Sequence, residues 1–203
     1  MKNSLVIGGS GFLGSHLVDL LVKKGHFVTN FDKKKISHDS NKIKFVKGDM
    51  LNEKKIGKLI KNKDYVFLFA GMSDLDEALE KPITSLKLNV LATCLVVKYC
   101  IAHKVKRLIY ASSIYANSEE GGFYAISKRS AEDYIDEFSK IYNLKYTILR
   151  FGSLYGERSD NNNGVKKLIH SAYTKKRLIY RGSKQASRKY IYVKDAAKLC
   201  ERI

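Results

Sequence analysis

A tyrosine and a lysine spaced four residues apart could carry out acid–base chemistry in this chain of 203 residues. Tyr124 and Lys128 stand in the run Phe123-Tyr124-Ala125-Ile126-Ser127-Lys128, and residues four apart share one face of a helix. A nearby ammonium group favours phenolate over phenol, so we expect Lys128 to lower the pKa of Tyr124 from its free value of about 10 toward neutrality, where proton exchange is efficient. In so Lys-rich a chain, an exposed helix pair without function is the alternative.

A glycine-rich turn near the N-terminus has the spacing of a dinucleotide-binding site. The apolar run Ser4-Leu5-Val6-Ile7 leads into Gly8-Gly9-Ser10-Gly11-Phe12-Leu13-Gly14 and then into an apolar helical segment. Gly8 permits a sharp exit from the strand, Gly11 lets the backbone approach a pyrophosphate, and Gly14 allows the helix to pack closely on the sheet. We expect Phe12 and Leu13 to join these glycines in contacting the dinucleotide. A purely structural turn is the alternative.

An acidic residue follows the second expected strand, where it would select the cofactor. Asp32 comes directly after the apolar segment 26–31. A carboxylate there would accept hydrogen bonds from an adenosine ribose and would repel a 2′-phosphate, which favours NAD. Lys33, Lys34 and Lys35 come next and leave NADP open as the alternative.

Short β-rich runs alternate with longer amphipathic runs along the chain. We expect strands at 4–8, 26–31, 43–47, 64–70, 106–112 and 144–150, and helices near 12–24, 52–62, 82–103, 124–142 and 164–174. This alternation predicts an α/β fold with a doubly wound parallel sheet. The carboxyl ends of such strands meet in one crevice, so we expect it to hold the residues that follow them, namely Gly8, Asp32, Asp49, Ala70, Ser113 and Phe151.

The net charge of +18 is large for an enzyme of small molecules. Lysines outnumber arginines 30 to 8, which favours a solvated basic surface over specific nucleic-acid recognition. Residues 164–203 hold twelve Lys or Arg against Asp195 and Glu201, a net of +10, so this segment is expected to meet an anionic ligand or an acidic surface. An aromatic among basic residues in 175–181 keeps RNA binding open, although it is the less favoured reading.

Two further features bear on compartment and metal binding. Cys94, Cys100 and Cys200 lack the spacing of metal ligands and are expected to be reduced core thiols, and no metal site is expected. No signal peptide is visible, and we expect no membrane span because no apolar stretch approaches about 18 residues. These features predict a cytoplasmic protein.

Taken in chain order, eight motifs resemble those of the extended short-chain dehydrogenase/reductases, the NAD-dependent nucleotide-sugar epimerase/dehydratase family. They are the turn Gly8 to Gly14, Gly48-Asp49-Met50, Phe69-Ala70-Gly71, Leu88-Asn89-Val90, Ser112-Ser113, Tyr124-x-x-x-Lys128, Leu149-Arg150-Phe151 with Tyr155-Gly156-Glu157-Arg158, and Arg188 to Asp195.

The resemblance implies a role for many of these residues. Ser113, Tyr124 and Lys128 would be catalytic, with Ser113 bonded to the reacting oxygen and Lys128 also touching the nicotinamide ribose. Asp49 and Met50 would flank the adenine, and the dinucleotide would also be lined by Phe69, Ala70, Gly71, Asn89 and Phe151. A sugar-nucleotide substrate would be bound by Ser113, Ser153 and Arg188, the last at its diphosphate. The resemblance further implies a homodimer through helices 82–103 and 124–142.

Departures from the family pattern narrow the expected reaction. Dehydratases of the family place Asp-Glu after the catalytic hydroxyl residue, but here Ile114 and Tyr115 stand there, so dehydration is not expected. Phe69-Ala70-Gly71 resembles the galactose-epimerase branch, and epimerisation through a transient keto-sugar is the leading hypothesis. Alternatives are a keto-sugar nucleotide reductase and a non-catalytic dinucleotide- or RNA-binding protein. Residues 1–163 would form the NAD-binding domain and 164–203 the start of a substrate lobe that is incomplete.

Overall fold

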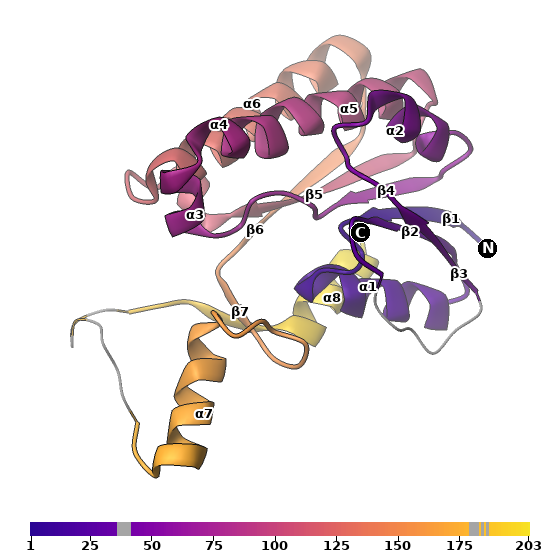
Figure 1. Cartoon of the computed structure of the whole chain (residues 1–203). Helices are drawn as coiled ribbons and strands as arrows, with labels where there is room; N and C mark the ends of the chain where they lie inside the picture. The colour runs from indigo at the N-terminus through magenta and orange to yellow at the C-terminus, as the bar shows by residue number, and fades with distance from the viewer. Residues whose placement is uncertain (36–41, 179–182, 184, 186) are drawn as a thin grey trace.

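A six-stranded, all-parallel sheet forms the centre of the computed structural model, which describes residues 1–35, 42–178, 183, 185 and 187–203 (Figure 1). Its strands lie in the order β3-β2-β1-β4-β5-β6. They are β1 (Asn3–Ile7), β2 (Phe27–Asp32), β3 (Ile43–Lys47), β4 (Tyr65–Leu68), β5 (Arg107–Ser113) and β6 (Tyr146–Phe151). Leu5, Val6 and Ile7 are fully buried, because a central parallel strand is covered on both faces. The predicted doubly wound sheet is confirmed.

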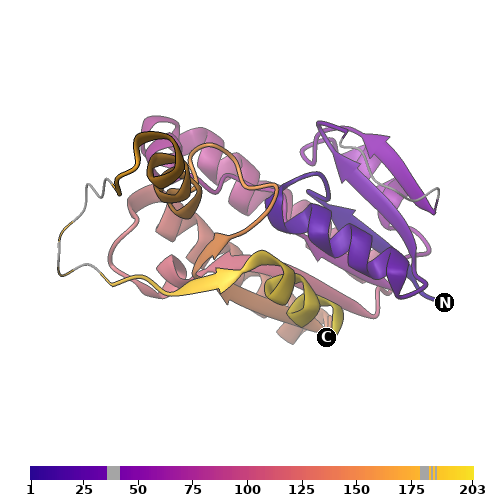
Figure 2. The same cartoon turned by 90° about the horizontal axis from the view of Figure 1, so that it is seen from below.

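Helices cover both faces of this sheet (Figures 1 and 2). One face carries α2 (Glu53–Ile60), α5 (Ala92–Ala102) and α6 (Gly122–Tyr142), and the other carries α1 (Phe12–Lys23) and α8 (Val193–Glu201). The sequence did not predict α8, whose residues Ala196, Ala197 and Cys200 share a core with Leu17 and Leu21 of α1. Part of the expected substrate lobe therefore returns to the core of the dinucleotide-binding fold, and the boundary expected at residue 163 does not separate α8 from it.

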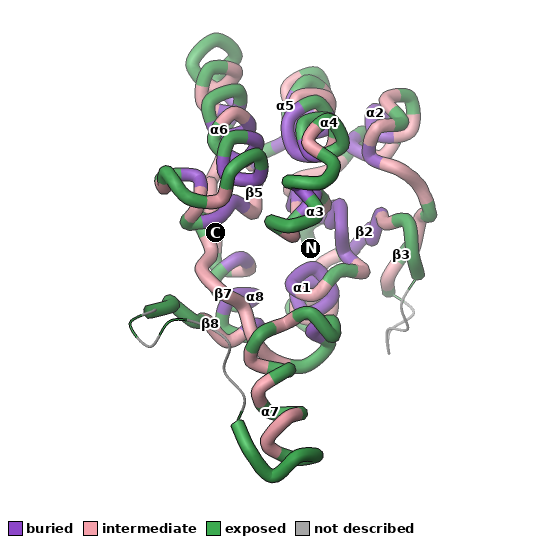
Figure 3. The backbone as a smooth tube through the Cα atoms, turned by 60° about the vertical axis from the view of Figure 1, so that its left-hand side comes forward, coloured by how far each residue is buried: buried purple, intermediate pink, exposed green. Residues whose placement is uncertain are grey.

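The helix expected at 82–103 is a continuous helical run of three parts. It consists of α4 (Pro82–Ser85), the π-helical segment η1 (Leu86–Leu91) and α5. A short helix, α3 (Leu75–Glu80), precedes it and was not predicted. Contrary to the sequence-based expectation, Pro82–Ala102 is long and apolar enough to cross a membrane by length and composition alone, with a mean hydropathy of 1.5. Its place against α6 and the sheet is that of a core helix (Figure 3).

The segment after β6 leaves the main body of the fold. Strands β7 (Ser153–Tyr155) and β8 (Tyr190–Tyr192) pair in a separate two-stranded sheet, and α7 (Gly164–Lys175) projects beyond it without a single buried residue (Figures 1 and 3). Helix α7 was predicted, whereas the three-residue strands are too short to show a pattern. Segment 175–181, which suggested RNA binding, lies partly outside the described residues.

Candidate active site

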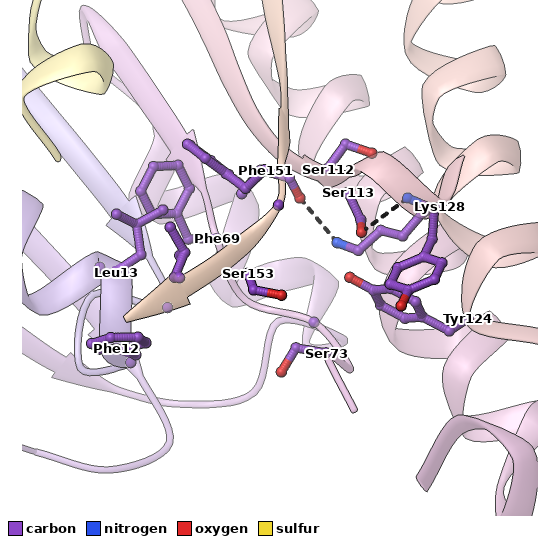
Figure 4. Close-up of a pocket in the computed structure, with 18 of the residues that line it drawn as sticks. Phe12, Leu13, Phe69, Ser73, Ser112, Ser113, Tyr124, Lys128, Phe151 and Ser153 are labelled. Carbon is purple, nitrogen blue, oxygen red and sulfur yellow. Dashed lines mark hydrogen bonds between the residues drawn. The ribbon is translucent and has the colours of Figure 1, made fainter. Parts of the chain in front are cut away.

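A cavity of about 1030 Å³ opens at the carboxyl ends of the strands, where ligands bind in sheets of this topology. Figure 4 shows Ser113, Tyr124 and Lys128 together on one side of it, with Phe12, Leu13 and Phe69 opposite. Most of the residues singled out in the sequence line this cavity. They are Gly8, Gly11, Phe12, Leu13, Gly14, Asp32, Met50, Phe69, Ala70, Gly71, Ser113, Tyr124, Lys128, Phe151, Ser153 and Arg188.

The glycine turn leaves space that only glycine can leave. A Cβ on Gly14 would lie 2.1 Å from the carbonyl oxygen of Gly8, and a Cβ on Gly8 would lie 2.4 Å from the amide nitrogen of Ala70. Gly8 also has a φ of +89°, which L side chains rarely adopt. Helix α1 begins directly after Gly11 and presents its free N–H groups at the cavity. This cradle fits a dinucleotide pyrophosphate.

Asp32 stands at the end of β2 beside that turn. Its Oδ2 accepts a hydrogen bond from the amide of Ser10 at 3.0 Å, and its Oδ1 accepts one from the amide of Lys34 at 3.2 Å. Each carboxylate oxygen has a second lone pair, so Asp32 can still accept hydrogen bonds from the hydroxyls of a ribose. The carboxylate is thus fixed in place and lines the cavity.

Asp49 differs from its neighbours because the cavity lining includes Gly48 and Met50 but not Asp49. Its carboxylate accepts from the amide of Leu51 at 2.9 Å and pairs with Lys33 at 3.0 Å. The Leu51 amide, helped by Lys33, lowers the pKa of Asp49. The pair ties the segment after β2 to the segment after β3, so a direct contact between Asp49 and adenine stays a prediction.

Tyr124 lies on the first turn of α6 and is 7% exposed. Burial raises the pKa of its phenol, while the hydroxyl of Ser113, as a hydrogen-bond partner, acts in the opposite direction. The expectation that the pKa of Tyr124 lies below its free value is therefore wrong for the protein in this structure. The free-energy cost of removing a phenolate from water exceeds the stabilisation that the nearby groups give it.

Lys128 is aimed at β5 rather than at Tyr124. Its Nζ donates to the carbonyl oxygen of Ala111 at 3.0 Å and to the hydroxyl of Tyr110 at 3.4 Å. Burial lowers its pKa to about 8, and the charge of Glu132 acts in the opposite direction. Lys128 is thus a buried group that stays protonated near neutrality and lines the cavity beside Tyr124.

Asn89 is the second predicted contact that does not line the cavity. Its side chain lies within η1, accepts from the amide of Met72 at 2.8 Å, and donates to the Met72 carbonyl and to Ser127 Oγ. Ser127 directly precedes Lys128, and Met72 follows Gly71, which lines the cavity. Asn89 therefore links the segment after β4 to helix α6 without lining the cavity itself. Its contact with a dinucleotide stays a prediction.

Several lining residues were not assigned to the site from the sequence. Tyr115 lies edge-on to Tyr124 with ring centroids 6.3 Å apart, and Ser73, Asn163 and Tyr190 also line the cavity. Asn163 caps α7 by accepting from the amide of Lys166 at 3.2 Å. An Asn before a helix is a recognisable cap signal, whereas Tyr190 reaches the cavity only through the pairing of β7 with β8.

Comparisons with known proteins show the family to which this chain belongs. Residues 4–203 match the model of the NAD dependent epimerase/dehydratase family. A putative UDP-glucose 4-epimerase of Methanocaldococcus jannaschii is 29% identical over 96% of this chain and 70% of its own. The UDP-N-acetylglucosamine 4-epimerase of Methanobrevibacter ruminantium M1, solved with UDP-N-acetylmuramic acid, is 28% identical, with a TM-score of 0.88 over 97% of this chain and 71% of its own.

A UDP-glucose 4-epimerase of Thermus thermophilus, solved with NAD, is 24% identical over 98% of this chain and 73% of its own, with a TM-score of 0.84, and shows the shared fold. The residues that match the family model include the glycine cradle, Asp32, Tyr124 and Lys128. The chain belongs to the NAD-dependent epimerase/dehydratase family of the extended short-chain dehydrogenase/reductases.

Proposed function

We propose that this protein epimerises a nucleotide sugar through a transient keto-sugar, with NAD retained as the cofactor. One observation carries the proposal. Ser113, Tyr124 and Lys128 line the same cavity as the glycine cradle and Asp32, so a substrate hydroxyl at Tyr124 would stand beside the reactive end of a dinucleotide. The relatives support the substrate class, since those described above act on UDP-sugars.

Tyr124 would move the proton in this reaction. Its oxygen, as the phenolate, would take the proton of the substrate hydroxyl, and the phenol so formed would return that proton after the keto-sugar has presented its other face. Ser113 would donate a hydrogen bond to the same substrate oxygen, and the charge on Lys128 would favour the phenolate. NAD, when bound, supplies the acceptor and donor of the hydride. Because burial raises the pKa of Tyr124, the base form depends on these two neighbours.

The side of the cavity formed by residues that follow β6 would bind the nucleotide of the substrate. Arg188 and Ser153 line it, and a guanidinium matches the oxygens of a diphosphate. The first residues of α7, Gly164 and Val165, line it as well. We therefore assign 164–178 to the beginning of a substrate-binding lobe. The anionic diphosphate of the substrate would then be the ligand that the basic residues of this segment attract.

Residues Ile114 and Tyr115 argue against dehydration. Both line the cavity after Ser113, and neither an alkyl group nor a phenol beside the buried Tyr124 replaces the carboxyl pair expected of a dehydratase. A keto-sugar reductase is the second candidate, favoured by the same cavity. A reductase would consume added NADH in proportion to the product formed. An epimerase would need only catalytic amounts of NAD and would consume no NADH.

The experiment compares the wild type with Tyr124→Phe and, as a matched control, Tyr134→Phe, an exposed tyrosine of the same helix. Interconversion of UDP-glucose and UDP-galactose, and of their N-acetyl forms, would be followed by chromatography. Quenching of protein fluorescence by added NADH would report cofactor binding separately. We expect Tyr124→Phe to lose turnover while NADH still binds. Normal turnover by Tyr124→Phe would reject the assigned base.

Assembly and location complete the proposal. We expect a homodimer through 82–103 and 124–142, because these helices carry exposed apolar side chains, namely Leu86, Leu91, Ile141 and Tyr142. Sedimentation would test it, and a monomer at high concentration would contradict it. A cytoplasmic location and the absence of nucleic-acid binding are further expectations, tested by fractionation and by RNA titration at low salt.

A further inference from the structure

A buried carboxylate lies behind the proposed catalytic pair. Glu132 is 5% exposed and follows Lys128 by four residues on α6, so both side chains lie on one face of the helix. It does not line the cavity. Burying an ionised carboxylate costs free energy unless charged partners surround it. The neighbours of Glu132 should therefore include cations that compensate its charge.

Arg150 is the first of these neighbours. From β6, the outer strand of the described sheet, its Nε donates to both carboxylate oxygens at 3.1 and 3.0 Å, and its Nη2 donates to Oε2. This is the fork geometry that binds a carboxylate most strongly. The Arg150 side chain is 43% exposed, so the guanidinium remains in contact with water. Arg150 thus compensates Glu132 from the solvent side.

Lys128 is the second neighbour, on the cavity side. Burial works against its charge, and Glu132 is the charged group that works in favour of it. The other titratable groups near the ammonium are two neutral phenols, Tyr110 from β5 and Tyr124 from α6. The elements η1 and α4 contribute the uncharged side chains of Asn89 and Ser85 to this part of the core.

We propose that Glu132 is a positioning residue that keeps Lys128 protonated at neutral pH, with Arg150 as the solvent-facing cation that allows this carboxylate to be buried. The consequence of this role of Glu132 for catalysis rests on the proposed function, in which a charged Lys128 holds a ribose and favours the phenolate of Tyr124. The protonation of Lys128 itself does not depend on any substrate.

The test is a direct titration of lysine side chains. Protein labelled with ¹³C at the lysine ε-carbon is titrated by NMR, and the signal of Lys128 is assigned by its absence in Lys128→Arg. A single lysine with a midpoint near 8 stands apart from exposed lysines, which titrate near 10. In Glu132→Gln we expect this midpoint to fall by about 1–3 pH units, the usual effect of losing one close opposite charge. Asp133→Asn, which removes a charge from the exposed next residue, should leave it unchanged.

Cofactor binding gives a second readout. NADH should bind Glu132→Gln about tenfold more weakly at neutral pH, as expected for a lost charge-assisted hydrogen bond, and acidification should restore the affinity. An unchanged Lys128 midpoint in folded Glu132→Gln overturns the proposal, whether or not the protein epimerises sugars. If Glu132→Gln does not fold, Arg150→Gln replaces it. Without the competing cation, the ionised Glu132 should raise the Lys128 midpoint, and a midpoint at or below the wild-type value overturns the proposal.

Discussion

Replacing Lys128 by methionine should change how the stability of the protein depends on pH. Lys128 is 7% exposed, and burial lowers its pKa from 10.5 to about 8. Below pH 8 the side chain is charged in both the folded and the unfolded chain, so folding carries the full cost of burying the charge. Between pH 8 and 10.5 the folded chain binds fewer protons than the unfolded chain, so the wild type gains stability as pH rises. Methionine has a similar length and no charge, so Lys128→Met lacks this gain.

The magnitude follows from the displaced pKa. At about 1.4 kcal/mol for each tenfold change in proton affinity, burying the charged Lys128 costs about 3 kcal/mol below pH 8. The variant also loses two hydrogen bonds, to Ala111 and Tyr110, worth about 1 kcal/mol each. We therefore expect Lys128→Met to be more stable than the wild type by about 1 kcal/mol at neutral pH. Because the hydrogen-bond loss is common to both conditions, the difference should shift by about 2–3 kcal/mol toward the wild type between pH 7 and pH 10.

Urea unfolding followed by circular dichroism at about pH 7 and about pH 10 measures this difference. Lys58→Met is the matched control, because Lys58 is an exposed lysine on α2, and its effect should be the same at both pH values. If the free-energy difference between wild type and Lys128→Met does not change with pH, Lys128 is not a charge that folding desolvates, and the electrostatic account of the site fails.

Four other substitutions test the cofactor cradle. Gly14→Ala should lower the free energy of unfolding in urea by about 1–3 kcal/mol, because its Cβ would lie 2.1 Å from the backbone oxygen of Gly8. Gly11→Ala should fold normally, since its Cβ would meet only that oxygen at 3.2 Å, yet it should bind NADH more weakly than the wild type. If Gly11→Ala were the less stable variant and still bound NADH normally, the assignment of the cradle would be contradicted. Asp32→Ala should weaken NAD binding by about 1–3 kcal/mol in a calorimetric titration. Asp32→Asn should lose less, as it keeps an acceptor for Ser10, and equal affinity for all three proteins would remove Asp32 from the site.

The parts of the site that follow from short-range spacing could be predicted from the sequence. The glycines after β1 and the acid after β2 are fixed by the local geometry of one strand–turn–helix unit, and they line the cavity as expected. The four-residue spacing of Tyr124 and Lys128 likewise determines that they share a helix face. Such patterns need no knowledge of the rest of the chain.

What could not be predicted depends on contacts between distant segments. Whether the Lys128 ammonium turns to Tyr124 or to Ala111 is decided by the carbonyl that β5 presents, and no pattern within α6 contains that information. Asn89 binds Met72, 17 residues away, so its role as a brace emerges only after folding. The nine-residue helix α8 was missed because a helix so short depends on packing against α1 for its stability.

One face of α6 carries the groups that the proposed chemistry requires. Tyr124, Lys128 and Glu132 follow one another at intervals of four residues, and Arg150 ends the row at the solvent. Lys128 and Arg150 each offset part of the cost of burying Glu132, and Glu132 offsets part of the cost of burying Lys128. The proton affinity of any one group therefore depends on the others, and the free energies of paired substitutions such as Lys128→Met with Glu132→Gln should not be additive. In the proposed mechanism, the activity of Tyr124 would therefore depend on the whole row, including Glu132, which does not line the cavity.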